Sequence, residues 1–149
     1  MKKVAVCILV LSMLMGLSGC LSALLFERDY RFMNEESEIT TIEIVEIDPE
    51  APNSEGEIIQ ATVGSVADVD AFLSEFSNLT CHETPIFASP NYFFESGLVI
   101  KFVYQNGDYE LVGPHAQGHY TNGKGYNNYK GFFSFEDDEF TKLLEKYTT

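Results

Sequence analysis

The stretch LVIKFVYQNGDYELV, residues 98–112, contains the clearest fold signal in the chain. Side chains along residues 98–105 alternate between the two faces that a β-strand would present. One face would hold Leu98, Ile100, Phe102 and Tyr104, and the other Val99, Lys101, Val103 and Gln105. Asn106 and Gly107 follow, and an alternating run resumes after them. Asn-Gly between two such runs is the strongest short-range signal for a hairpin. The sequence therefore predicts two antiparallel strands that turn at Asn106 and Gly107.

Two other segments have the spacing of amphipathic helices. Along residues 65–79, apolar side chains recur every three or four positions and form one stripe. Ser65 followed by Asp68 has the form of a capping box that opens this helix. Residues 134–147 repeat the spacing after a capping Ser134, with acids in the first turn and lysines in the last, as the helix dipole favours. Because short isolated helices are marginal in water, we expect both to cover a sheet.

Three further segments are typical of strands. Residues 38–47 are rich in Ile, Thr and Val, and their apolar positions change parity, which predicts a bulge or burial on both faces. Residues 57–63 form a strand with Ile59, Ala61 and Val63 on one face, and residues 81–87 form a short strand. These elements together predict an α+β fold, with a single antiparallel sheet of about five or six strands and two helices packed on one face.

The N-terminus has the composition of an export signal. Two lysines precede an apolar run over residues 4–15, and small residues follow it. The segment ends with Leu17-Ser18-Gly19-Cys20, which resembles the lipobox of bacterial lipoproteins. That resemblance implies that a peptidase cleaves before Cys20 and that its sulfur carries a diacylglyceryl group. It predicts a signal peptide over residues 1–19.

An acylated Cys20 places the mature protein outside the cytoplasm, anchored to the cell membrane by lipid, because two or more acyl chains hold a protein on a bilayer. We expect residues 20–26 to form a lipidated tether and residues 27–149 a single acidic α+β domain. The anchor also leaves Cys81 as the only thiol of the mature chain, so no internal disulfide forms. We expect Cys81 to be a buried side chain at the start of a strand.

The charge balance excludes one class of partner. The chain has 9 basic and 23 acidic residues, a formal charge of −14. Loss of the leader removes Lys2 and Lys3 and leaves seven basic against 23 acidic residues, a formal charge of −16. Such a field repels phosphate backbones, so we expect no binding to nucleic acid.

The mature chain also resembles small uncharacterised lipoproteins of low-GC Gram-positive bacteria. The shared features are a strand pair, a capped helix, a Tyr-x-Asn-Gly hairpin and a final Phe-x-x-Leu-Leu helix, here at residues 104–107 and 140–144. The resemblance implies a location in the cell envelope, and it implies neither an activity nor site residues.

One stretch differs from the rest of this acidic chain. No acidic residue occurs between Glu110 and Glu136, and glycine, asparagine and tyrosine are frequent there. Tyrosine gives a large, rigid contact area, while glycine and asparagine let a loop adapt, and binding loops combine these residues. The candidate binding residues are His115, His119, Tyr120, Asn122, Lys124, Tyr126 and Tyr129.

Other interpretations of this stretch remain open. It can form a second hairpin that turns at Asn122 and Gly123, with its tyrosines lying across the sheet. A hairpin can also serve as a binding surface, so the two interpretations are compatible. His115 and His119 have the spacing of a metal pair on a helix, which suggests a small metal-dependent or hydrolytic envelope enzyme, although Pro114 opposes a helix there.

We therefore expect a non-catalytic, lipid-anchored binding module outside the cytoplasm. Its partner would be an envelope or extracellular protein or glycan, which contacts residues 113–131. We expect no catalytic residues, no metal and no cofactor. A further alternative is an acidic, immunity-type inhibitor that blocks its partner by shape and negative charge.

Overall fold

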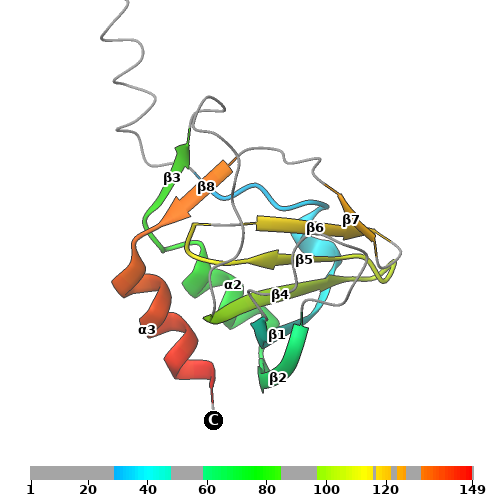
Figure 1. Cartoon of the computed structure of the whole chain (residues 1–149), viewed down its shortest axis with the longest axis horizontal. Helices are drawn as coiled ribbons and strands as arrows, with labels where there is room; N and C mark the ends of the chain where they lie inside the picture. Colours follow the sequence, from blue (N-terminus) through cyan, green and yellow to red (C-terminus); the bar gives the residue numbers. More distant parts are fainter. Residues whose placement is uncertain are drawn as a thin grey trace, which may run out of the picture.

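Six antiparallel strands form the main sheet of the protein (Figure 1). The structure, a computed structural model, describes residues 29–47, 59–84, 97–115, 117–121, 124–126 and 132–148. The sheet order is β2-β1-β4-β5-β6-β7. The strands are β1 (Ile39–Ile47), β2 (Ile59–Ser65), β4 (Gly97–Tyr104), β5 (Tyr109–Val112), β6 (Gln117–Thr121) and β7 (Lys124–Tyr126).

The remaining elements complete an α+β fold, as the sequence predicted. A 3-10 helix, η1 (Glu36–Glu38), precedes β1, and the two α-helices are α2 (Val69–Phe76) and α3 (Asp137–Tyr147). The predicted single sheet needs one refinement, because β3 (Cys81–Thr84) pairs with β8 (Phe132–Phe135) in a separate two-stranded sheet. The predicted leader and tether, and residues 57–58 and 85–87 of two predicted strands, lie outside the described residues.

The predicted hairpin is confirmed. β4 and β5 pair antiparallel, with Val103 opposite Tyr109. Gly107 has a φ of 85°, which glycine adopts without a steric penalty. The Asn106 side-chain oxygen accepts a hydrogen bond of 2.9 Å from the Asp108 N–H, so the asparagine stabilises the turn.

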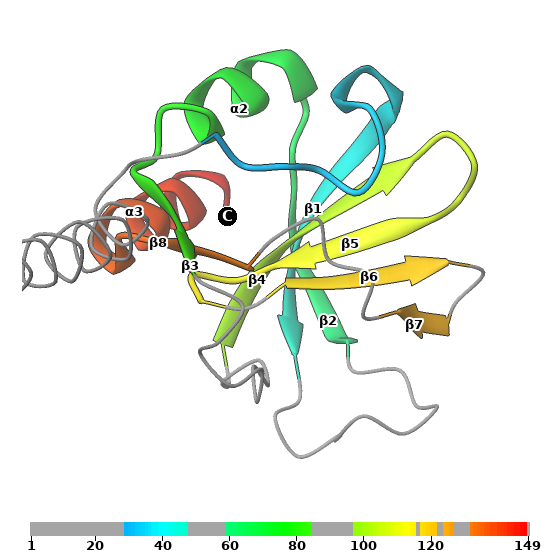
Figure 2. The ribbon, with the colours of Figure 1, turned by 90° about the horizontal axis from the view of Figure 1, so that it is seen from above.

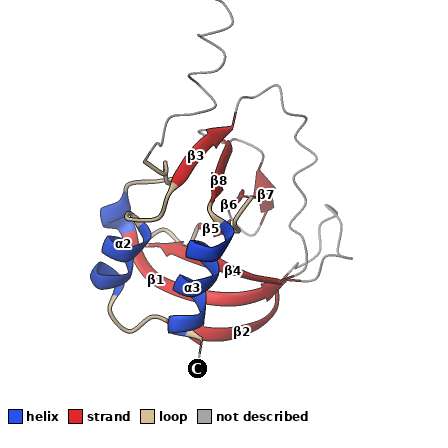
Figure 3. Ribbon diagram, turned by 90° about the vertical axis from the view of Figure 1, so that its left-hand side faces the viewer, coloured by secondary structure: helices blue, strands red, loops and turns tan. Residues whose placement is uncertain are grey.

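Both helices cover the same face of the main sheet (Figure 3), as the sequence predicted. The apolar residues of the two helices share one core with alternate side chains of β1 and β4. The buried contributors are Ile42, Ile44, Phe72, Leu73, Phe76, Ile100, Phe102, Phe140, Leu143 and Leu144. We call this side of the sheet the helix face.

The opposite side of the sheet, here called the outer face, has a smaller apolar cluster. It contains Val45, Ile47, Val99 and Leu111, which are all buried. β1 therefore has buried side chains on both faces, which is one of the two explanations for its change of parity. Cross-strand pairs on each face stabilise such a sheet.

The pairing of β2 corrects a prediction about its faces. Its register with β1 shifts between Ile44 and Val45 and again between Glu46 and Ile47. Each shift adds a residue to β2 and changes the side on which the following side chains lie. As a result, Ile59 packs against the outer-face cluster and Val63 against the helix-face core, so the predicted common face is wrong.

The helix starts also differ from the predicted caps. Asp68 is itself the N-cap of α2, and its carboxylate accepts a 3.0 Å hydrogen bond from the Ala71 N–H. Ser65 belongs to β2, and Ser134 belongs to β8, while Glu136 precedes the first turn of α3. An aspartate satisfies the free N–H groups of a helix start as a serine does, so the segment still forms a helix.

A side-chain amide joins the two sheets. The Gln117 Nε2 donates to the Phe133 carbonyl at 2.7 Å, and its Oε1 accepts from the Phe133 N–H at 3.0 Å. The Phe135 N–H donates to the Pro114 carbonyl at 2.8 Å. β8 is therefore fixed to β6 and to the β5–β6 connection by backbone groups that would otherwise be buried without partners.

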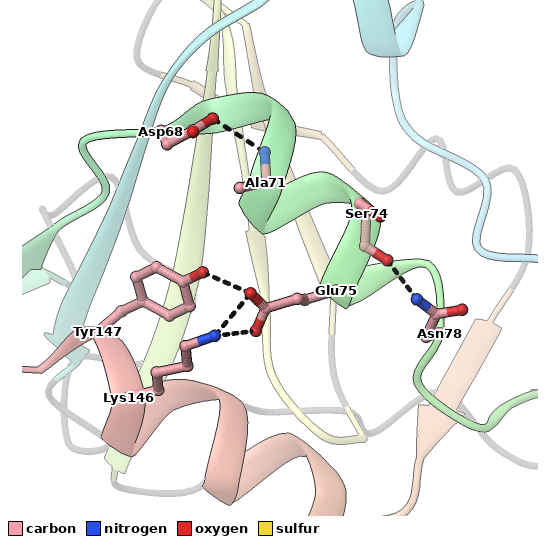
Figure 4. A network of polar contacts seen from close by, with 7 residues as sticks. All are labelled: Asp68, Ala71, Ser74, Glu75, Asn78, Lys146 and Tyr147. Carbon is pink, nitrogen blue, oxygen red and sulfur yellow. Dashed lines mark hydrogen bonds and ion pairs between the residues drawn. The ribbon is translucent and has the colours of Figure 1, made fainter.

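The ends of α2 and α3 meet in a polar network (Figure 4). The Lys146 ammonium lies 2.6 Å from Glu75 Oε1, and the Tyr147 hydroxyl donates to the same oxygen at 3.0 Å. Hydrogen bonds from Lys146 and then from Tyr147 lower the pKa of the Glu75 carboxyl. The same contact with Glu75 raises the pKa of Lys146.

We predict that Gly64→Ala destabilises the domain. A Cβ at this position would lie 2.4 Å from the backbone oxygen of Tyr147, so the end of α3 would have to move away from β2. Overpacking of this kind costs about 1–3 kcal/mol of the free energy of unfolding. Urea denaturation measures the loss, and Thr62→Ala, at an exposed position of the same strand, is the matched control. Equal stabilities of the two variants would contradict this packing.

We predict that the stabilising effect of Glu75 disappears in acid. Because the folded protein lowers the pKa of this carboxyl, the contribution is present at neutral pH and is lost as the pH falls through that lowered pKa. Glu75→Gln should therefore lower Tm at pH 7, and this Tm difference should shrink as the pH falls through the acid range. Glu145→Gln, at an exposed position of α3, is the control. A Tm difference that persists in acid would show that Glu75 acts through packing instead of charge.

Candidate functional site

Strands β5 and β6 present different chemistry on their two faces. Tyr109 pairs with Tyr120, and the next residues, Glu110 and His119, pair with each other. Because successive side chains of a strand point to opposite faces, the tyrosines lie on the outer face and the Glu-His pair lies on the helix face. Of the predicted binding residues, Tyr120 therefore lies on the outer face and His119 on the helix face.

The outer face carries a stack of two aromatic rings. The Tyr109 and Tyr120 rings are parallel within 6°, with their centroids 4.7 Å apart. Both residues are half-buried and pack against the outer-face cluster. The Lys101 ammonium lies 5.1 Å from the centroid of the Tyr109 ring and 2.9 Å from Glu43 Oε2. The cation and the carboxylate hold the end of the stack by cation–π and ion-pair contacts.

The helix face carries a buried polar cluster. Glu110 is completely buried, and the Nε2 atom of the buried His119 lies 3.3 Å from its Oε2. The Tyr104 hydroxyl donates to Oε1 at 2.5 Å, and the Tyr30 hydroxyl donates to Oε2 at 3.4 Å. The Met33 N–H also donates to Oε2, at 3.1 Å. These donors satisfy a carboxylate that burial would otherwise destabilise strongly.

The cluster changes the acidity of its tyrosines. Burial, followed by the nearby Glu110, raises the pKa of Tyr30 well above its ordinary value. The same two causes raise the pKa of Tyr104, against backbone hydrogen bonds from Asn34 and Met33 that lower it. Both hydroxyls therefore stay protonated and act as donors to Glu110.

The structure separates the two histidines that the metal-site hypothesis joined. His119 faces Glu110 inside the core, whereas His115 is exposed and its Nε2 lies 2.9 Å from Asp137 Oδ1. His119 thus contacts a carboxylate of β5, whereas His115 contacts a carboxylate of α3. In the part of the chain that the structure describes, no three His, Cys, Asp or Glu side chains are grouped so that they could hold a metal ion.

The acidic start of α3 has local partners. The Thr80 N–H donates to Glu139 Oε2 at 2.8 Å, and this contact lowers the pKa of Glu139. His82 Nε2 lies 3.5 Å from Glu136 Oε1. Glu139 thus attaches α3 to Thr80, directly before β3, and Glu136 lies beside His82 in β3. His115 adds a third contact, to Asp137 in the first turn of α3.

The other predicted site residues have different positions. Thr121 pairs with Lys124, so β6 and β7 form the arms of the second predicted hairpin. Lys124 and Tyr126 belong to β7, at one edge of the sheet. Cys20, Asn122 and Tyr129 lie outside the described residues.

Cys81 has the expected surroundings. It is the first residue of β3 and is buried. Burial, and then the nearby Asp29 and Glu83, raise its pKa to about 12. The folded protein therefore keeps this sulfur as an unreactive thiol at neutral pH.

The sequence did not identify Lys101, Tyr109 and Glu110 as site residues. Tyr109 and Glu110 are part of a regular strand, and one carboxylate carries little information in a chain this acidic. The available signal was the hairpin register, which places Glu110 opposite Phe102 on an apolar face.

Comparisons of the chain with protein families, with curated proteins and with solved structures find no match. Among the described helices, none has the length and the apolar composition that crossing a membrane requires.

Proposed function

We propose that this protein is a lipid-anchored binding module that acts outside the cytoplasm. Its partner is an envelope or extracellular protein or glycan, and the contact surface is the outer face of β5 and β6 together with the acid-free stretch of residues 113–131. The stacked pair of Tyr109 and Tyr120 is the observation that carries this proposal.

The tyrosine stack has the physical properties of a recognition surface. Each ring has a large contact area and few rotatable bonds, so its immobilisation on binding costs little entropy. The stack with Lys101 fixes the rings before a partner arrives. A preorganised surface loses less free energy in ordering and binds more tightly.

The charge distribution supports the same surface. Residues 111–135 contain no acid, while the mature chain as a whole carries a formal charge of −16. Strong negative charge holds a domain away from an anionic lipid surface. A partner with its own negative charge would meet least repulsion at this neutral-to-basic stretch.

The lipid anchor is tested on the product made in cells. Mass spectrometry of the membrane fraction should find a chain that begins at Cys20 and carries a diacylglyceryl group. Cys20→Ser should keep the leader and accumulate as the full-length precursor. An unmodified Cys20 thiol, or an intact leader on the wild-type chain, would contradict the anchor.

The binding surface is tested in intact cells by photo-crosslinking. A photoreactive phenylalanine analogue replaces Tyr120 in the full chain, and the control places it at Asp70, an exposed position of α2. We expect a discrete adduct from position 120 only. Protease digestion of the adduct identifies a protein partner, and digestion by a glycan hydrolase identifies a glycan. The same adducts from both positions, or none from position 120, would show that this face binds no partner.

A further inference from the structure

Tyr109 and Tyr120 lie directly opposite each other on β5 and β6, which run side by side in the curved sheet (Figure 2). Their rings are parallel within 6°, and the ring centroids are 4.7 Å apart. Opposite side chains of antiparallel strands have Cβ atoms about 5 Å apart, so the ring separation matches the strand separation. The sheet therefore holds two phenol rings face to face.

The contacts around Tyr109 limit the directions in which its ring can move. Lys101 belongs to β4, on one side of β5, and its ammonium lies 5.1 Å from the ring centroid. The same ammonium lies 2.9 Å from Glu43 Oε2, which holds the lysine in place. Tyr120 belongs to β6, on the other side of β5. Tyr109 thus lies between a fixed cation and the second tyrosine.

Two other described tyrosines have rings packed against phenylalanine. The Tyr30 ring lies 5.1 Å from the Phe133 centroid and 5.7 Å from the Phe135 centroid. The Tyr147 ring lies 4.9 Å from the Phe72 centroid. In the tyrosine stack, by contrast, each phenol contacts a second phenol, and both residues are half-buried. An oxidant in solvent can therefore reach both members of the stack.

We propose that the tyrosine stack is a site of oxidative coupling, at which a haem peroxidase acting with hydrogen peroxide joins Tyr109 to Tyr120 as dityrosine. The geometry of the two rings carries this inference. It does not depend on the proposed function, because the coupling requires neither a binding partner nor the lipid anchor.

The coupling removes two electrons and two protons from the pair of tyrosines. Each hydroxyl loses one electron and one proton, which leaves a tyrosyl radical whose unpaired electron is shared with the Cε atoms. One Cε of each ring then forms a carbon–carbon bond with the other. The hydrogen on each of these carbons moves as a proton to the ring oxygen and restores the phenol. Hydrogen peroxide accepts the two electrons and two protons and becomes two molecules of water.

The arrangement favours coupling within one molecule. Two reactants held in contact react in a unimolecular step, which is much faster than an encounter in solution. Each tyrosine ring turns about two side-chain bonds, so rotations can bring the Cε atoms together while the strands stay paired. Two copies of a chain with a formal charge of −14 also repel each other. Coupling between molecules is therefore disfavoured.

The product would be a covalent link between β5 and β6. It closes the loop of chain from Tyr109 to Tyr120, and such a closure lowers the conformational entropy of the unfolded state, as a disulfide does. Among the described residues, Cys81 is the only cysteine, so this part of the chain contains no internal disulfide. Dityrosine would also fix the register of the two strands.

Peroxidase treatment of the full, cell-made protein in detergent tests the site. Dityrosine has a blue fluorescence that tyrosine lacks, and the chain contains no tryptophan that could obscure it. We expect this fluorescence on monomeric chains in a denaturing gel. A glutamate-specific protease cleaves after Glu110, between the two tyrosines. The two peptides should stay linked, with a mass two hydrogen atoms below their sum.

Conservative variants identify the coupled residues. Tyr120→Phe keeps the ring but removes a hydroxyl that must be oxidised, and it should lower the yield of linked peptides about tenfold or more. Tyr109→Phe should have the same effect. Tyr147→Phe removes a hydroxyl that contacts Glu75, away from the stack, and should leave the yield unchanged. Coupling should also raise the Tm of the wild-type chain by about 5–10 °C.

Three outcomes would overturn the inference: no dityrosine in the wild-type chain, dityrosine in covalent dimers alone, or equal yields of linked peptides from wild type and Tyr120→Phe. An unchanged Tm after coupling would show that the link does not join β5 to β6 in the folded protein, and it would overturn the inference too. Photo-crosslinking at position 120 tests the binding surface separately, so either proposal can fail without the other.

Discussion

The burial of one carboxylate organises this domain. Glu110 lies on the helix face of β5, inside an aromatic core, and it requires hydrogen-bond donors from separate parts of the chain. Tyr104 comes from the neighbouring strand, and Tyr30 with Met33 from the segment before β1. The Nε2 atom of His119, on the strand at the other side of β5, lies 3.3 Å from the same carboxylate. If any of these elements moved away, a buried charge would lose its compensation, which costs several kcal/mol. The polar cluster thus specifies where the N-terminal segment lies, while the surrounding rings supply most of the apolar burial.

Alternation along β5 and β6 links this core to the proposed binding surface. Tyr109 and Tyr120 stack on one face, directly beside the Glu110 and His119 pair on the other. The position of the rings depends on the register of the two strands, and that register also determines the Glu110 contacts. A shift of one residue would expose the carboxylate to the outer face and bury both tyrosines in the core. The register that buries Glu110 in the core is therefore the same register that places Tyr109 and Tyr120 on the outer face.

Local signals were sufficient to predict the class of fold. The 98–112 hairpin, the helical spacing and the common face of the two helices are confirmed, because each depends on residues close in sequence or on the need to cover apolar surface. The separate β3–β8 sheet was missed, since its strands have four residues each and their pairing joins distant segments. Tyr120 was identified from composition, but its partner Tyr109 and the buried Glu110 depend on cross-strand register. In β2, the two bulges placed Ile59 and Val63 on opposite faces, and simple alternation contains no information about bulges.

The contacts of Tyr30 determine the order in which the molecule can be completed. Its ring packs on Phe133 and Phe135, about one hundred residues later in the chain. A ribosome delivers the N-terminus first, so the first described segment of the protein must wait for nearly the last before it can dock. Contacts at such sequence separation form late, because closing a long loop costs entropy before any contact repays it. The nascent chain consequently exposes the aromatic side chains of this segment until synthesis is almost finished, and this interval is when a chaperone would be of most use.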